Sequence, residues 1–508
     1  MEIISNIIKA AIEVGSKLKR HETPVESQKE TLKELLQKSK NTAFGKYYGF
    51  ESLLNTKNFQ QEFAKEIPYH DYDDMEFWWR KSYEGKPDIC WPEKVDNFAV
   101  SSGTTGHSKH IPVTDEMLES IRNAGLQQVL SLSNFKDLPE SFYTKQILML
   151  GSSTNLDEKA GHLEGEISGI SAANIPNWFH AFYKPGQEIS SIDDWDSRVE
   201  AIAKEAKNWD IGSISGIPSW IELMLQRVME YHKVDSIHDI WPNLAVYTSG
   251  GVALDPYKKS FEKLFSKPVQ YIDTYLASEG YLATQVRPET DAMQLIYDNG
   301  VYFEFVPFDE DSILESGKIN PEKKALNISQ VEEGKEYILL ISTVSGTWRY
   351  MIGDTIKFTD VGRSEIKITG RTKFFLNVVG SQLSVNKMDD AIESLNEEFP
   401  INIKEFTVAA VKENDEYIHH WYLGVEDLNK GFDHSEIKDH LDQKLKNNNK
   451  NYKVARDKAL KDVKVDIVSV DQFIAWNDQN KKKGGQVKMA KVMKEEAFRE
   501  WQEFIANQ

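Results

Sequence analysis

The stretch AVSSGTTGHSKHIPVT, residues 99–114, is the most informative part of the 508-residue chain. Four hydroxyl side chains and two glycines fill the six positions 101–106, and Lys109 adds a positive charge. Glycine allows a backbone to approach a ligand closely, and hydroxyls and free N–H groups can surround phosphate oxygens. The spacing is not that of the Walker motif. The alternative is a flexible surface loop, but the strand-like residues on both sides favour a phosphate-binding loop.

Outward from this loop, short apolar runs alternate with amphipathic segments. We expect strands at residues 146–150, 244–247, 269–272, 301–306 and 337–343, and helices at residues 193–208 and 218–232. Alternating strands and helices indicate a layered α/β fold, and some strands follow each other through short turns, which predicts mixed sheets. We therefore predict a large multi-layer domain over residues 1–375, with mixed β-sheets flanked by helices.

The pattern changes near GRTKFFLNVVG, residues 370–380. Beyond it we expect a hairpin at residues 406–411 and 417–425, helices at 434–447 and 451–461, and a strand at 463–468. These elements predict a small α+β domain over residues 376–508. Its lysine-rich stretches are by default solvated surface.

Composition and charge limit the class of function. Lysine and arginine total 61 against 80 acidic residues, a net charge of −19, so nucleic acid and anionic membrane surfaces are unfavourable partners. The only cysteine, Cys90, excludes an intramolecular disulfide and is interpreted as a small buried side chain. Residues 1–20 have the spacing of an amphipathic helix, and no apolar run reaches the ~18 residues that span a bilayer. We expect a cytoplasmic protein.

Two weaker signals follow in the second half of the large domain. YTSGGVAL, residues 247–254, predicts a strand that ends in a turn at Gly250 and Gly251, where a flat ring or a backbone can come close. DTYLASEGY, residues 273–281, offers Tyr275 as a stacking ring and Glu279 as a carboxylate for a cation. A Gly-Gly turn is common, and a strand end with a solvated glutamate is the alternative for the second segment.

Further signals lie around the predicted domain boundary. In SGTWRYMIGDTIKF, residues 345–358, Arg349, Tyr350 and Asp354 bracket a Gly-Asp turn expected between two strands. The aspartate either bonds its own backbone or accepts two ribose hydroxyls. Gly370 and Arg371 have the character of a hinge whose arginine touches a nucleotide. KKKGGQVKMAK, residues 481–491, is either a basic surface loop or a functional lysine loop.

Taken in order, these signals resemble the adenylate-forming superfamily. More closely, the chain resembles a bacterial-type member of the Gretchen Hagen family of acyl acid amido synthetases, also called the auxin-responsive promoter family. The match is carried by SSGTTGHSK (101–109), YLASEG (275–280) and TVSGTWRYMIGD (343–354). NTAFGK (41–46), IPYHDYDD (67–74), GIPSW (216–220) and SVNKMDD (384–390) support it. The resemblance runs from about residue 40 to the C-terminus, and the motifs are specific only in combination.

The resemblance implies the adenylate-forming fold and a ligase that uses ATP and Mg²⁺. Such an enzyme converts a carboxylic acid to an acyl-adenylate and pyrophosphate, and an amino acid amine then attacks the acyl carbon to give an amide and AMP. Its partners are therefore two small molecules, the acid and the amino acid.

The resemblance also implies roles for individual residues. It assigns to the nucleotide Ser101, Ser102, Gly103, Thr104, Thr105, Gly106, Lys109, Gly250, Gly251, Tyr275, Asp354 and Arg371. In this set the loop hydroxyls hold phosphate oxygens, Tyr275 frames the adenine and Asp354 binds the ribose. Glu279 is implied as the Mg²⁺ ligand, and Lys387 and Lys488 as catalytic lysines.

Two other functions and one substrate question stay open. A coenzyme A ligase of the same superfamily would share the adenylation step but pass the acyl group to a thiol. A catalytically inactive nucleotide-binding module is the other alternative. An acyl pocket could be built between residues 151 and 185, where the candidates are His162, Trp178, Phe179, Phe182 and Tyr183, but core packing is the favoured interpretation of these side chains. Trp348 and Met351, which flank Arg349–Tyr350, depart from the pattern of plant members.

Overall fold

The computed structural model describes residues 23–101, 109–135, 138–251, 254–309, 311–314, 317–372, 375–376, 383–413, 416–428, 431, 433–458, 460–479, 489–493 and 495–507. The chain divides into two compact units. One consists of Met1–Ile352 and Ile356–Lys367, and the other of Gly353–Thr355 and Ile368–Gln508. The helix predicted at residues 1–20 lies outside the described residues.

The first unit begins with helices whose starts are set by local capping. The α-helices of this unit are α2 (Pro24–Ser39), α3 (Ala43–Tyr47), α4 (Phe50–Leu54), α5 (Phe59–Glu66), α6 (Tyr72–Tyr83), α7 (Asp115–Ser131), α8 (Ile167–Ala173), α9 (Gln187–Ser190), α10 (Trp195–Glu205), α11 (Pro218–His232) and α12 (Asp255–Leu264). Short 3₁₀ turns lie at Leu132–Asn134, Glu140–Thr144, Asn177–Phe179, Ala206–Asn208 and Ile237–Asp239. Asp71 and Asp74 form a capping box that fixes the start of α6, because each side chain accepts a backbone N–H of the other residue.

Two sheets form the body of this unit. The strands are β1 (Asn97–Ser101), β2 (Lys109–Val113), β3 (Gln146–Leu150), β4 (Asp157–Lys159), β5 (His162–Gly165), β6 (Tyr183–Lys184), β7 (Ile211–Gly216), β8 (Val246–Gly250), β9 (Gln270–Ala277), β10 (Gly280–Thr284), β11 (Met293–Leu295), β12 (Val301–Pro307), β13 (Glu336–Thr343), β14 (Thr347–Asp360) and β15 (Glu365–Arg371). In the described residues four strands pair in the order β2-β1-β5-β4, and eleven in the order β12-β13-β14-β15-β11-β10-β9-β8-β7-β3-β6.

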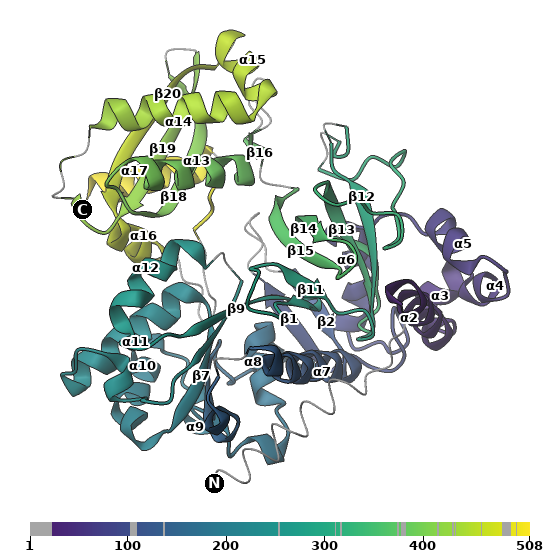
Figure 1. The fold of residues 1–508 in the computed structure, drawn as a ribbon. Coiled ribbons are helices and arrows are strands. Elements are labelled where there is room, and N and C mark those ends of the chain that lie inside the picture. Colours follow the sequence, from purple (N-terminus) through teal and green to yellow (C-terminus); the bar gives the residue numbers. More distant parts are fainter. Residues whose placement is uncertain are drawn as a thin grey trace. The chain divides into compact units, whose positions relative to one another are not determined.

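Strand pairing in the larger sheet changes from parallel on one side of β9 to antiparallel on the other. The pairs from β9 through β8, β7 and β3 to β6 are parallel, and α10, α11 and α12 pack beside this half (Figure 1). On the other side of β9, the pairs β9–β10, β10–β11, β11–β15 and β12–β13 are antiparallel. The predicted mixed sheet is thus confirmed, and the expected strand at 146–150 and helix at 218–232 coincide with β3 and α11.

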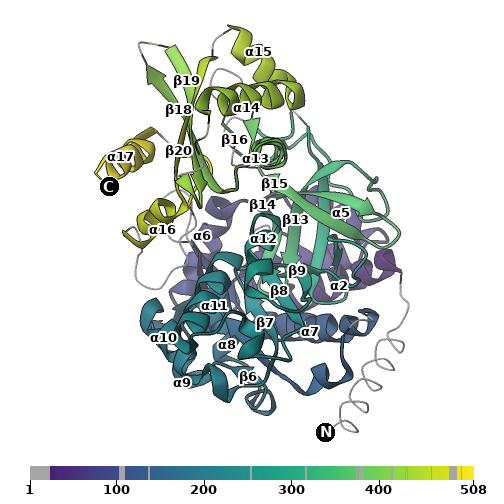
Figure 2. The ribbon, with the colours of Figure 1, turned by 60° about the vertical axis from the view of Figure 1, so that its left-hand side comes forward.

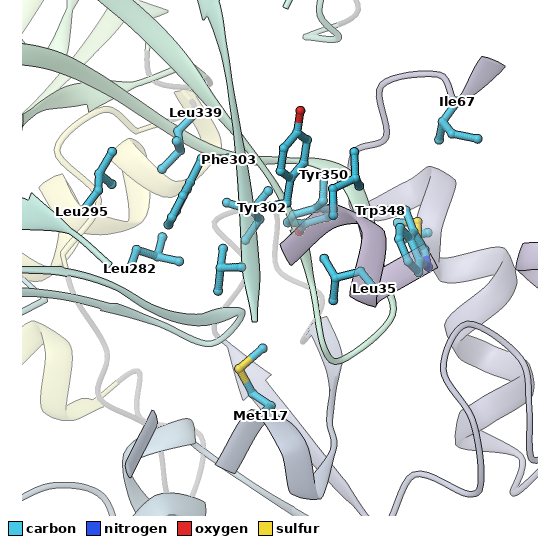
Figure 3. Close-up of a cluster of buried hydrophobic side chains, with 14 of the residues drawn as sticks. Leu35, Ile67, Met117, Leu282, Leu295, Tyr302, Phe303, Leu339, Trp348 and Tyr350 are labelled. Atoms are coloured by element: carbon cyan, nitrogen blue, oxygen red, sulfur yellow. The ribbon is translucent and has the colours of Figure 1, made fainter. Parts of the chain in front are cut away.

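The main hydrophobic cluster joins the N-terminal helices to the antiparallel half of the sheet. Figure 3 shows Leu35 of α2 and Met117 of α7 among side chains of β10 to β14, including Tyr302, Trp348 and Tyr350. Cys90 is buried in the same cluster, as the sequence predicted, and burial raises the pKa of its thiol. A buried neutral thiol is a packing group rather than a nucleophile.

A buried ion pair fixes the chain that precedes α6. The Arg349 guanidinium donates from Nε and Nη2 to the two Glu304 carboxylate oxygens, both at 2.9 Å, and its Nη1 donates to the carbonyls of Ala64 and Ile67 at 2.6 Å. Only 3 % of the Arg349 side chain and 4 % of the Glu304 side chain are exposed. Burial alone would lower the pKa of Arg349, but Glu304 and Tyr69 raise it, so the guanidinium stays charged.

The backbone at this point is strained. Arg349 has a φ of 41°, a left-handed conformation that side chains other than glycine seldom adopt. Its carbonyl accepts the His70 N–H at 3.0 Å, and the His70 carbonyl accepts the Met351 N–H at 2.8 Å. The segment before α6 is therefore held on β14 through both backbone and side chain.

The second unit is a three-stranded sheet between two helical layers. Its strands are β16 (Phe375–Leu376), β17 (Leu383–Ser384), β18 (Ile403–Glu413), β19 (Glu416–Val425) and β20 (Leu460–Ser469), and its helices are α13 (Val385–Glu398), α14 (His434–Asn448), α15 (Lys450–Lys458), α16 (Val470–Gln479) and α17 (Glu495–Ala506). In Figure 2, α13 and α14 lie on one face of β18–β19–β20, and α16 and α17 on the other. Successive residues of β19 point to opposite faces of the sheet, so Trp421 packs into one hydrophobic core and Tyr422 into the other.

Two sequence expectations were wrong in detail. The helix expected at residues 451–461 ends at Lys458, and β20 begins at Leu460, because Val463 and Val465 are needed in the core beside β19. The Gly-Asp turn expected between two strands is not a turn. β14 runs unbroken through Gly353 and Asp354, and Gly353 takes a φ of 97° that glycine tolerates without a side-chain clash.

The ion pair of Arg349 and Glu304 makes a stability prediction. Glu304→Ala leaves the guanidinium buried without its carboxylate, so we expect the free energy of unfolding to fall by about 3–5 kcal/mol. A urea titration followed by tryptophan fluorescence measures this, since Trp79 and Trp348 lie in the same cluster.

Glu332→Ala is the matched control. It removes an ion pair with Lys335 whose side chains are 64 % and 59 % exposed, and it should change the free energy of unfolding by less than about 0.5 kcal/mol. Coincident unfolding curves for the two variants would show that the buried pair does not stabilise this unit.

Candidate active site

The predicted phosphate loop joins two paired strands. β1 ends at Ser101 and β2 begins at Lys109, and these two residues oppose each other in the antiparallel register. The two ends of the loop are thus held together. Ser102, Gly103, Thr104, Thr105 and Gly106 lie outside the described residues, as does the side chain of Ser101.

Lys109 lies beside the first residue of α6. Its Nζ is 5.1 Å from the centre of the Tyr72 ring, a cation–π distance, and the next residue, His110, donates its backbone N–H to the Tyr72 hydroxyl at 3.0 Å. Tyr72 belongs to the segment IPYHDYDD, which the sequence marked only as supporting the resemblance. The structure shows that this segment positions the lysine.

Glu279 lies in the turn between β9 and β10, with 8 % of the residue exposed. Burial raises the pKa of Tyr350 well above its usual value, and the charge of Glu279 and a hydrogen bond with it raise that pKa further. Tyr350 therefore stays protonated beside the carboxylate. Its ring lies 5.5 Å from that of Trp79, which is 5.9 Å from that of Tyr72, so Glu279 and Lys109 flank one aromatic cluster.

The residues present fit Mg²⁺ only as a partly protein-bound ion. Mg²⁺ commonly takes one or two carboxylates and completes its shell with water and substrate phosphate oxygens. Glu279 supplies one buried carboxylate. Within the described ranges, no group of three or more His, Cys, Asp or Glu side chains could hold a metal without such help.

The predicted glycine turn lies at an edge where parallel strands end. Gly216 of β7 pairs with Ser249 of β8, and the next residue of β8, Gly250, pairs with Thr274 of β9. A Cβ on Gly250 would lie 2.9 Å from the Thr274 hydroxyl, which already donates to the Ser249 carbonyl at 2.8 Å. Ligands of open α/β sheets bind at such carboxyl ends.

Two of the predicted nucleotide residues near this edge differ in exposure. Gly251 is exposed and has a φ of 83°, which a side chain would make unfavourable. Tyr275 follows Thr274 in β9, but the residue is only 5 % exposed and its ring belongs to the main hydrophobic cluster. Its role beside the adenine stays a prediction.

Asp354 and Arg371 are brought together across β14 and β15. The Arg371 Nε donates to Asp354 Oδ1 at 2.8 Å, and the Thr372 N–H donates to the Gly353 carbonyl at 2.7 Å. Only 8 % of the Asp354 side chain is exposed, against 55 % for Arg371. The predicted ribose ligand and hinge arginine are thus direct partners in this structure.

The two predicted catalytic lysines belong to the second unit. Lys387 is half-buried in the first turn of α13, whereas Lys488 lies outside the described residues. The chain after Lys488 is held firmly, because Lys491 pairs with Asp389 of α13 at 2.6 Å and accepts the Val408 N–H on its carbonyl at 2.9 Å. This ion pair could not be predicted from the sequence, since the two residues are far apart along the chain.

Some aromatic candidates for an acyl pocket are buried in the core, and others are half-buried. His162 and Tyr183 are buried, and they hydrogen-bond to Glu164 and Ser190 respectively. Phe179 and Phe182 are half-buried, and the side chain of Trp178 lies outside the described residues. Core packing, the simpler interpretation of the sequence, holds for His162 and Tyr183.

Comparison with known proteins identifies the family. The N-terminal, central and C-terminal domain models of the GH3 family match residues 17–203, 294–371 and 386–497. The chain is 22 % identical to jasmonoyl–L-amino acid synthetase JAR6 of Nicotiana attenuata over 416 residues, which is 69 % of this chain and 70 % of that protein. It is 27 % identical to indole-3-acetic acid-amido synthetase GH3.2 of Arabidopsis thaliana over 200 residues, 37 % and 36 % of the two chains.

Solved structures show the same fold. The GH3.15 acyl acid amido synthetase superposes with a TM-score of 0.78 at 15 % identity, over 98 % of this chain and 96 % of the other. A 2-hydroxyisobutyryl-CoA ligase in the postadenylation state superposes with a TM-score of 0.58 at 13 % identity, over 94 % and 91 %. These likenesses confirm the predicted α/β fold of adenylate-forming enzymes. Since the three domain models together span most of the sequence, the chain belongs to the GH3 family.

Proposed function

We propose that this GH3 family protein is an ATP-dependent acyl acid amido synthetase. It adenylates a carboxylic acid and transfers the acyl group to an amino acid amine. The observation that carries the proposal is the match to all three domains of the family, with relatives named as amido synthetases. Lys109 and the buried Glu279, which border one aromatic cluster, support it from the geometry of the first unit.

In the first step a carboxylate oxygen of the acid attacks the α-phosphorus of ATP, and pyrophosphate leaves. Negative charge accumulates on the phosphate oxygens, so preoriented donors and cations lower the barrier. In our proposal the hydroxyls of Ser101, Ser102, Thr104 and Thr105 and the Lys109 ammonium group bind these oxygens. Mg²⁺, when bound at Glu279, neutralises phosphate charge.

The remaining assignments place the rest of the nucleotide. We assign the ribose hydroxyls to Asp354 and the adenine to the edge formed by Gly250, Gly251 and Tyr275. Arg371 would then exchange its contact with Asp354 for one with the nucleotide. In the second step the amine nitrogen attacks the acyl carbon, AMP leaves and the amine loses a proton.

The two domains divide this work in our proposal. Residues 1–375 bind ATP and the acid, and residues 376–508 bring Lys387 and Lys488 to the reacting groups. No described helix is long and apolar enough to cross a membrane. We infer a cytoplasmic enzyme, because its only cysteine is buried and reduced, with small-molecule rather than nucleic acid partners.

The metal assignment predicts a large loss of adenylation in Glu279→Ala. We expect acid-dependent pyrophosphate release to fall roughly 100-fold or more at saturating Mg²⁺, because phosphate charge loses its main counterion. The melting temperature should change much less than the activity, since the loss of a hydrogen bond to the Tyr350 hydroxyl costs only about 1–3 kcal/mol.

Tyr350→Phe is the matched control, because it keeps the carboxylate and removes the same hydrogen bond. If Tyr350→Phe lost as much activity as Glu279→Ala, the effect would come from the hydrogen bond and the metal assignment would be wrong.

The transfer step distinguishes an amido synthetase from a coenzyme A ligase. Incubation with ATP, Mg²⁺, an accepted acid, the twenty standard amino acids and coenzyme A should yield an N-acyl amino acid and AMP in equal amounts, detected by mass spectrometry. An acyl thioester as the main product would favour the coenzyme A ligase. If AMP formed without either product, the natural acceptor would belong to a class of molecule that the assay did not contain.

A further inference from the structure

A buried arginine in the first unit has no role in the site described above. Arg198 lies in the first turn of α10 and is only 6 % exposed. Among the residues that the structure describes, no hydrogen-bond partner is found for its Nε. A buried polar atom without a hydrogen-bond partner is costly, so the Nε–H of Arg198 calls for an explanation such as a bound ligand or water.

The groups around Arg198 are acidic, but they are engaged elsewhere. Asp193, Asp194 and Glu166 are its charged neighbours, together with the Tyr183 hydroxyl. Burial lowers the pKa of Arg198 in spite of these neighbours.

The charges of the neighbouring acids favour the charged guanidinium, but these acids accept hydrogen bonds from other groups. Asp193 accepts from the Asn155 amide at 2.8 Å, and Asp194 accepts the Ser197 N–H at 2.7 Å to cap α10. The Ser152 hydroxyl donates to Glu166. Arg198 therefore lies among carboxylates that are oriented towards other donors.

Two indole rings connect this position with the edge of the parallel sheet. The Arg198 guanidinium carbon is 5.4 Å from the centre of the Trp195 ring, and the Trp195 and Trp220 rings are 4.6 Å apart. Trp220 lies in the first turn of α11, shortly after Gly216 ends β7. Gly216 in turn neighbours Ser249, next to the glycines that we assign to the nucleotide.

The charges select the kind of ligand. A guanidinium binds a carboxylate with two parallel hydrogen bonds. A simple anion would, however, be repelled by three nearby carboxylates, whereas a zwitterion would satisfy both signs. An α-amino acid carries a carboxylate and an ammonium group on one carbon, and its side chain could lie against the indoles.

We propose that Arg198 binds the α-carboxylate of the acceptor amino acid, with Glu166 accepting a hydrogen bond from its ammonium group and with Trp195 and Trp220 beside its side chain. This inference rests on the proposed amido synthetase function. According to this inference, Arg198 contributes to binding of the acceptor amino acid and not to binding of the carboxylic acid substrate.

Arg198→Met provides the test, because methionine has similar length and no charge. Since the variant removes a buried cation whose Nε has no hydrogen-bond partner among the described residues, we expect its melting temperature to equal or exceed that of the wild type. In amide formation the KM for the amino acid should rise at least tenfold. The rate of acid-dependent pyrophosphate release and the KM for the acid should stay within twofold. A lower melting temperature would mean that Arg198 stabilises the fold, and a raised KM for the acid would assign it to the acyl pocket; either result overturns the proposal.

Arg227→Met is the matched control on the neighbouring helix. Arg227 pairs with Glu200 and Glu230 and its side chain is 37 % exposed, so its loss should leave the KM for the amino acid unchanged. Glu166→Gln is a second variant, which should weaken amino acid binding without removing the guanidinium.

Binding without catalysis separates this inference from the proposed function. Thermal melts of the wild type with each of the twenty standard L-amino acids, with and without ATP and Mg²⁺, should show a rise for at least one of them. That rise should be absent in Arg198→Met and present in Arg227→Met. A shift that persists in Arg198→Met, or no shift with any amino acid, contradicts the assignment even if amide synthesis is established. A shift that depends on Arg198 in a protein that makes no amide would instead contradict only the proposed reaction.

Discussion

The buried ion pair between Arg349 and Glu304 fixes the part of the first unit on which the candidate site depends. Arg349 also binds the carbonyls of Ala64 and Ile67, so it ties the end of α5 to β12 and β14 at once. The cost of burying two charges is offset because all three guanidinium nitrogens donate to buried or half-buried acceptors. The strained φ of Arg349 is tolerated for the same reason.

This attachment has consequences for the chemistry. The chain that leaves the ion pair pairs with β14 through His70 and then starts α6 at the Asp71 cap. Tyr72 therefore reaches Lys109, while Tyr350, the residue after Arg349, reaches Glu279. One structural arginine thus sets the relation between a cation and a carboxylate that we assign to the phosphates and their metal.

The sequence predicted the family, the α/β fold class and many of the elements, and the comparisons and the structure confirm them. Strands with strong local patterns, such as β3, and helices with a proline start, such as α11, were correct to the residue. The sequence could not show that β14 continues through Gly353, because a Gly-Asp pair forms turns more often than kinked strands. Nor could it show that Arg349 is a packing residue, since the burial of an arginine is decided by partners such as Glu304 that lie far away in the chain. Arg198 carried no signal for the same reason.

The site was predicted as a set of positions and not as an arrangement. The resemblance carried roles over one residue at a time, but the contacts between Lys109 and Tyr72 and between Arg371 and Asp354 appear only in three dimensions. Tyr275 illustrates the difference, because its motif suggests a stacking ring while the structure packs the ring into the core.

Exchange of labelled pyrophosphate into ATP tests the central claim most directly, because it detects adenylation before any acceptor is known. The assay would use a panel of aryl, indole and aliphatic carboxylic acids, with Mg²⁺ and without amino acids. We predict exchange that requires one class of acid and is lost when Mg²⁺ is chelated. If ATP binds by calorimetry but no acid in a broad panel supports exchange, the protein is a nucleotide-binding module and not an amido synthetase.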